Sequence, residues 1–106
     1  MPAPFSCDLT AIRRAERGAH QALIRRLVSE AIGDIVDLPN GLALRFPADA
    51  YDTVVRFVAG ERLCCPFLSF TLEIASERGG LSLRLTGPAG IKEFLRAALH
   101  LSAGAS

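Results

Sequence analysis

An adjacent pair of cysteines, Cys64-Cys65, followed directly by Pro66, is the part of this 106-residue chain best suited to chemistry. Consecutive Cα atoms lie about 3.8 Å apart, whereas an ordinary disulfide needs about 4.4–6.8 Å. A disulfide between the two neighbours would therefore be strained and easily reduced. Two thiolates at this spacing can instead share a soft metal ion or act as a redox pair. The pattern indicates thiol or soft-metal chemistry without naming a substrate.

Two charged residues, Glu61 and Arg62, precede the pair, and we expect both to tune it. Helical spacing places Glu61 one turn before Cys65 on the same inward stripe, where a carboxylate needs water, a partner or a proton. Arg62 favours the thiolate, whereas the negative end of the helix dipole disfavours it. A bound cation would decide between them, because coordination deprotonates a thiol.

Three residues nearer the N-terminus extend the candidate site. Glu16 and His20 are four positions apart and share a mainly apolar helical face, so His20 is a candidate metal ligand or proton shuttle with Glu16 as its partner. Cys7 lies just ahead of that helix and is a candidate third sulfur ligand. Three thiolates suit Cu(I), As(III) or trigonal Hg(II), and two suit Hg(II) or Cu(I).

Each of these residues also has a structural interpretation. A cysteine often behaves as a small buried hydrophobe, and Cys7 alone fits that role better than the role of a ligand. His20 on an apolar face is more often a core histidine with a hydrogen-bond partner. Glu61 and Arg62 can be a charge pair at a helix end. Two neighbouring cysteines before a proline favour the functional interpretation for the pair itself.

The elements that would position the pair follow the order α-ββα-ββα. The patterns that predict them are helical spacing of apolar residues, strand alternation, an Asn-Gly turn, a Gly-Gly turn and prolines at helix ends. The expected helices span about 11–31, 48–63 and 88–101, and the expected strands span about 34–38, 42–46, 68–74 and 81–85.

A short internal similarity suggests that a ββα unit occurs twice. Residues 41–46 (GLALRF) closely match residues 80–85 (GLSLRL), and a helical pattern follows each. One unit, about 34–63 or about 67–101, cannot bury its apolar strand face alone. Two units can pair into a four-stranded antiparallel sheet with helices on one face. We therefore predict a single α+β domain over residues 1–106.

Net charge, apolar runs and cysteine count limit the binding partners and the cellular compartment that we expect. The net charge of +1 predicts no nucleic-acid partner. The first ten residues lack the basic start and apolar core of a signal peptide, and the longest apolar run is far short of the ~20 residues of a membrane helix. Three cysteines, an odd number, argue against a secreted disulfide framework. We expect a soluble cytoplasmic protein with reduced thiols and no membrane partner.

The chain resembles a group of small bacterial proteins that carry an E-R-x-C-C-P-F motif. The resemblance implies a loose association with mercury-resistance or other metal-resistance genes. A narrower chemical likeness is to the vicinal cysteines near the C-terminus of mercuric reductases, which capture Hg(II) and pass it inward. Here the pair is in mid-chain, so a swinging-tail transfer is not expected. The motif rests on Glu61, Arg62, Cys64, Cys65, Pro66 and Phe67.

These observations favour a binding protein over an enzyme. The leading hypothesis is capture of a soft ion by thiolate exchange, with Hg(II) first and Cu(I) or As(III) next, for storage or for transfer to another thiol. The expected ligands are Cys64, Cys65, Cys7 and His20. A thiol-disulfide oxidoreductase or redox sensor is the second hypothesis. The third is a dimerisation module with structural cysteines, because such small sheets leave strand edges that pair readily. The expected partners are therefore a metal ion or a small thiol, with a homodimer left open.

Overall fold

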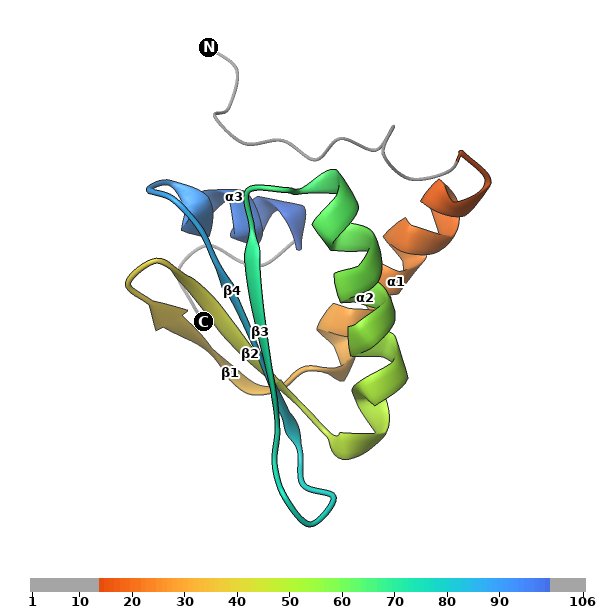
Figure 1. Cartoon of the computed structure of the whole chain (residues 1–106), viewed down its shortest axis with the longest axis vertical. Coiled ribbons are helices and arrows are strands. Elements are labelled where there is room, and N and C mark those ends of the chain that lie inside the picture. The colour runs from red at the N-terminus through yellow and green to blue at the C-terminus, as the bar shows by residue number, and fades with distance from the viewer. Residues whose placement is uncertain (1–13, 100–106) are drawn as a thin grey trace.

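The computed structural model describes residues 14–99, and it confirms the predicted order of elements (Figure 1). Two short 3-10 turns, η2 and η3, precede the first two helices. The elements are η2 (Arg14–Glu16), α1 (Arg17–Glu30), β1 (Ile32–Leu38), β2 (Gly41–Phe46), η3 (Ala48–Ala50), α2 (Tyr51–Cys64), β3 (Ser69–Ile74), β4 (Leu81–Thr86) and α3 (Ile91–Ala98).

The four strands form one antiparallel sheet in the order β1-β2-β4-β3. The two hairpins meet through their second strands, so β2 and β4 occupy the centre. Leu44 lies opposite Leu83 at the middle of this pair, and Leu42 lies opposite Leu85. The two similar sequence segments are therefore direct neighbours, related by an approximate two-fold axis. The predicted four-stranded antiparallel sheet is confirmed.

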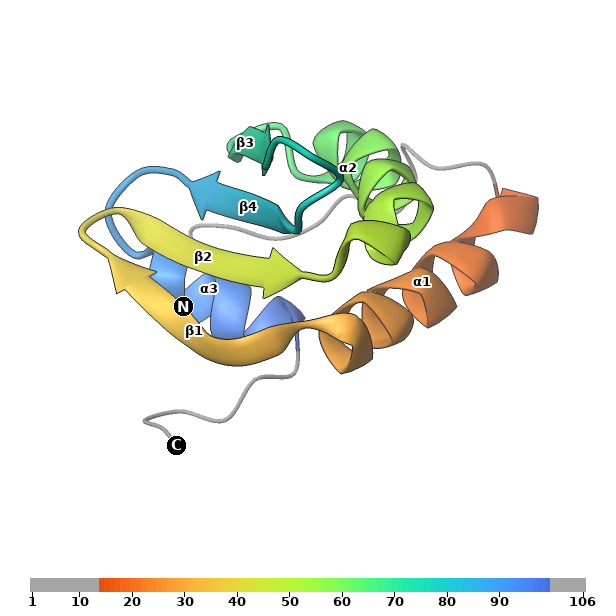
Figure 2. The same ribbon diagram turned by 90° about the horizontal axis from the view of Figure 1, so that it is seen from below.

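The core lies between one face of the sheet and the three helices (Figure 2). Alternation along β2 and β4 sends their leucines to this face, and each helix adds one or more fully buried side chains. The opposite face is polar and carries the exposed side chains of Arg45, Thr71 and Arg84. The largest buried contributions to the core come from Phe46, Phe57, Leu27, Leu42, Leu44, Leu83, Leu85, Ile91, Leu95 and Leu99.

Two boundaries differ from the predicted ones. Helix α1 ends at Glu30 because Ala31 has an extended backbone, and β1 begins at Ile32 and contains Gly33 (φ 68°) in an irregular stretch of strand pairing. Helix α3 begins at Ile91, three residues later than predicted, because Gly90 (φ 91°) has a left-handed conformation that is not helical. The predicted helical residues 11–13 and 100–101 lie outside the described part of the chain.

The lengths and compositions of the helices bear on membrane insertion. Within residues 14–99, no helix is both long enough and apolar enough to cross a bilayer.

Candidate metal centre

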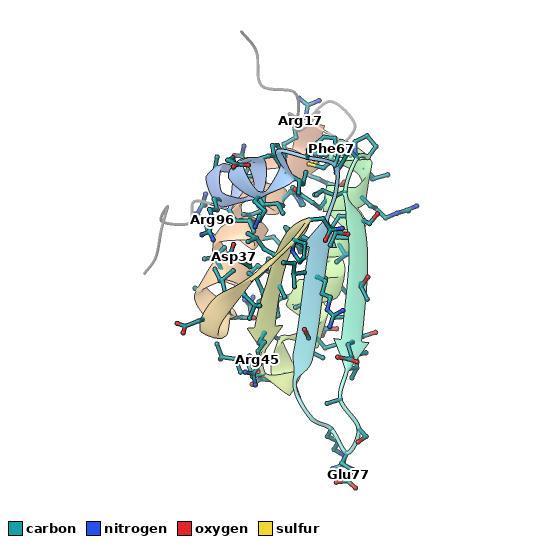
Figure 3. The ribbon with its side chains drawn as sticks, turned by 90° about the vertical axis from the view of Figure 1, so that its left-hand side faces the viewer. Arg17, Asp37, Arg45, Phe67, Glu77 and Arg96 are labelled. Atoms are coloured by element: carbon teal, nitrogen blue, oxygen red, sulfur yellow. The ribbon has the colours of Figure 1, made fainter. Side chains whose placement is uncertain are left out.

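A cluster of polar side chains lies where the C-terminal half of α2 packs against α1. Glu61 and Cys64 lie on the buried face of α2, together with Phe57. His20 approaches them from α1. The exposed fractions are 6% for His20, 2% for Glu61 and 1% for Cys64. Figure 3 shows Arg17 and Phe67 at this end of the molecule, opposite the end that carries Arg45 and Glu77.

The two helices are joined here by an imidazole-carboxylate contact. His20 Nε2 lies 3.0 Å from Glu61 Oε2. The imidazole also stacks on Phe57, with ring centroids 6.4 Å apart and planes 10° apart. Gly60 makes this approach possible, because a Cβ at that position would lie 2.6 Å from the imidazole ring. The histidine is therefore held on one side by a ring and on the other by a carboxylate.

Glu61 lies between the imidazole and both cysteine sulfurs. Its Oε2, which contacts His20, is 3.8 Å from Cys64 Sγ, and its Oε1 is 3.2 Å from Cys65 Sγ. The backbone N–H of Cys65 donates a 2.8 Å hydrogen bond to the Glu61 carbonyl oxygen, which closes the last turn of α2. The carboxylate expected to need a partner in the core thus has the imidazole and the two sulfurs around it.

The two cysteines differ in their covalent state. Their sulfurs are 3.6 Å apart, well beyond the roughly 2.05 Å of a disulfide bond. Cys64 is a buried thiol outside any disulfide. Cys65 is disulfide-bonded, and no residue within 14–99 supplies the other sulfur. The expectation of reduced thiols therefore holds for Cys64 and not for Cys65 in this structure.

Three side chains are arranged so that they could hold a metal ion. Within residues 14–99, one ligand atom from each of His20, Glu61 and Cys64 lies within 4.8 Å of the other two. Nitrogen, oxygen and sulfur donors of these kinds form the three-ligand sites that leave one coordination position open. The thiolate adds a preference for soft ions. The sulfur of Cys65 already lies 3.2 Å from the same carboxylate, and reduction would free it as a second thiolate donor.

The structure brings together only part of the predicted site. His20, Cys64, Cys65 and Glu61 converge. Arg62 lies on the exposed face of α2, and Glu16 is exposed before the first turn of α1. The carboxylate that contacts His20 is therefore Glu61 and not Glu16.

The remaining predicted ligand, Cys7, lies outside the described residues. The contact between His20 and Glu61 was not predicted. A partial signal was present, because the sequence pattern places both His20 and Glu61 on apolar faces of their helices.

Comparison with protein-family models, with curated proteins and with solved structures gives no match to this chain. The functional argument therefore rests on the geometry of the buried cluster.

Proposed function

We propose that this protein binds one thiophilic metal or metalloid ion through Cys64, His20 and Glu61, joined by Cys65 when that cysteine is reduced. The observation that supports this proposal is the convergence of three buried donor atoms within 4.8 Å of one another, from two different helices. The function is sequestration of the ion or its transfer to another thiol.

The energetics of burial support an ion at this position. A carboxylate, an imidazole and a thiol that leave water lose hydration, and polar groups in a core are costly unless they are paired. Apolar side chains of similar size often replace such buried pairs without loss of stability. A bound cation gives these three groups a common partner that an apolar replacement would lack.

The donor atoms set the expected order of ions. Hg(II) comes first, because two thiolates satisfy its linear coordination and Cys64 and Cys65 are neighbours. Cu(I) comes next, because two thiolates suit it as well. As(III) prefers three thiolates, and Cys7 is the third sulfur that we propose for it.

Transfer to or from a small thiol would proceed by ligand exchange. An incoming thiolate forms a bond to the ion as one protein thiolate leaves it, and the departing sulfur takes up the proton that the incoming thiol has lost. The oxidation states of the ion and of the sulfurs do not change.

The test is native mass spectrometry of the reduced full chain, titrated separately with Hg(II), Cu(I), As(III) and Zn(II) against competing glutathione. We expect one ion per chain, lost in Cys64→Ser and retained in Ala59→Ser, a matched change on the exposed face of α2. Failure of the wild-type chain to retain any ion would overturn the proposal. Equal retention by Cys64→Ser would also overturn it.

A second candidate function, thiol-disulfide exchange, is favoured by one specific observation. The thiol of Cys64 lies 3.6 Å from the sulfur of Cys65, which is disulfide-bonded. A Cys64 thiolate that attacked this sulfur would form a new S–S bond and release the original partner as a thiol, once that partner had taken up a proton. Mass mapping of the fully reduced chain, with mild peroxide as the oxidant that re-forms the bridge, tests this role. A reversible loss of two hydrogens with a defined bridge supports it, and overoxidation without a bridge opposes it.

A further inference from the structure

We infer that two copies of this chain form a two-fold symmetric dimer in which β3 of one copy pairs with β3 of the other, in antiparallel register centred on Leu72. The starting point is the order of the sheet, which leaves β1 and β3 as the edge strands among the described residues. This inference does not depend on metal binding.

The two edges differ in how well they are protected against pairing. In β1 the ladder is irregular between Ile32 and Val36, Gly33 is left-handed, and two carboxylates, Asp34 and Asp37, lie within seven residues. Bulges and charges are the devices by which proteins block an edge strand. In β3 the ladder runs without irregularity, and the strand contains no proline or lysine and a single charge, Glu73. The edge that is open to pairing is therefore β3.

The backbone of β3 has the orientation that such pairing needs. The Ala75 N–H donates a 3.0 Å hydrogen bond to the Gly80 carbonyl at the end of the hairpin. Because hydrogen-bonded residues alternate along an antiparallel strand, Ser69, Thr71 and Glu73 direct their backbone groups toward β4. The N–H and C=O groups of Phe70, Leu72 and Ile74 therefore point to the open edge.

The register centred on Leu72 gives complementary side-chain pairs. It places Leu72 opposite its own copy and Phe70 opposite Ile74 of the second copy. Aromatic side chains opposite β-branched ones stabilise neighbouring strands. Thr71 lies opposite Glu73, so no like charges face each other. This register also covers Ile74, which is 55% exposed in the single chain.

Helix α2 supplies an apolar surface beside the same edge. Gly60 faces α1 through His20, and Tyr51 and Val55 lie about 140–180° around the helix from it. Figures 1 and 2 both place α2 between α1 and β3. Tyr51 and Val55 are 46% and 37% exposed. Because the two-fold axis would be perpendicular to the sheet, both copies of α2 would lie on one face and cover the new strand pair.

The first test is sedimentation equilibrium of the full chain from about 1 μM to about 1 mM, the range of weak to moderate association. We expect a dimer for the wild type. Ile74→Lys should raise the dissociation constant at least about tenfold, because it places a charge in the new strand pair opposite the Phe70 ring of the second copy. Val36→Lys is the matched control on β1, since Val36 is 47% exposed, and it should leave the dimer unchanged. Circular dichroism checks that both variants fold.

A cross-link tests the register independently of that variant. Directly opposed, hydrogen-bonded residues have Cα atoms about 5.5 Å apart, which suits a disulfide. Leu72→Cys treated with oxidised glutathione should give a covalent dimer, whereas Thr71→Cys should give only the wild-type background. A wild-type chain that stays monomeric at the highest concentration would overturn the inference. Dissociation by Val36→Lys and not by Ile74→Lys, or cross-linking through residue 71 and not 72, would also overturn it.

Discussion

Glu61 is the central residue of the buried cluster, because its carboxylate contacts each of the other members. One oxygen contacts the imidazole of His20, and the same side chain lies against both cysteine sulfurs. Such a group is expensive to bury and easily replaced in a core by an apolar side chain. The energetic cost of burying Glu61 and His20 can therefore be separated by mutation from the ligand role that we propose for them.

A double-mutant comparison makes that separation. His20→Phe keeps a ring against Phe57 but removes one partner of Glu61, so it should lower the free energy of unfolding by about 1–3 kcal/mol. The double variant His20→Phe/Glu61→Met should recover most of this loss and still bind no ion. Urea unfolding with a chelator and a reductant present measures both values. If the single variant is as stable as the wild type, the imidazole contact contributes nothing to the fold.

At the scale of elements, two helical glycines predict opposite effects of the same substitution. In Gly60→Ala, the new Cβ would lie 2.6 Å from the His20 ring, so the imidazole must shift from its place between Phe57 and Glu61. We expect a loss of about 1–3 kcal/mol, typical of overpacking, together with weaker ion binding. In Gly18→Ala, nothing lies within 4 Å of the new Cβ. That variant should gain up to about 1 kcal/mol from helix propensity.

Thermal and urea unfolding of both alanine variants check this contrast, and native mass spectrometry reports the ion. The idea that Gly60 is needed for the approach of α1 fails if both substitutions stabilise the chain equally. It also fails if Gly60→Ala retains the ion with wild-type affinity.

At the scale of the whole molecule, the order of elements could be predicted, because alternating leucines and glycine turns mark both hairpins. The order of strands could not, since two hairpins can join through either edge. In the structure β2 is buried at five of its six positions, as expected of a central strand. The late start of α3 depends on Gly90, whose left-handed backbone the helical pattern did not reveal.

The candidate site, too, could be predicted from the sequence only in part. The cysteines and the inward position of Glu61 could be predicted from spacing along one helix. The contact of Glu61 with His20 joins residues 41 positions apart and depends on how α1 crosses α2. Such a crossing is set by tertiary packing and not by the local sequence, which is why Glu16 was the expected partner. A local pattern identifies candidate ligands, whereas the packing of helices decides which of them meet.

The burial of this cluster has a kinetic consequence. His20, Glu61, Cys64 and Cys65 each expose 6% or less of their surface, so an ion has no direct path from solvent to these groups. Helix α1, which forms one wall, has two buried residues, His20 and Leu27, its other core contacts are half-buried, and its main partner among the other long elements is α2. A wall with so few buried residues is the kind of segment that opens locally before the rest of a fold does. Loading and release would then follow the opening rate of α1, so a tightly held ion could still exchange quickly.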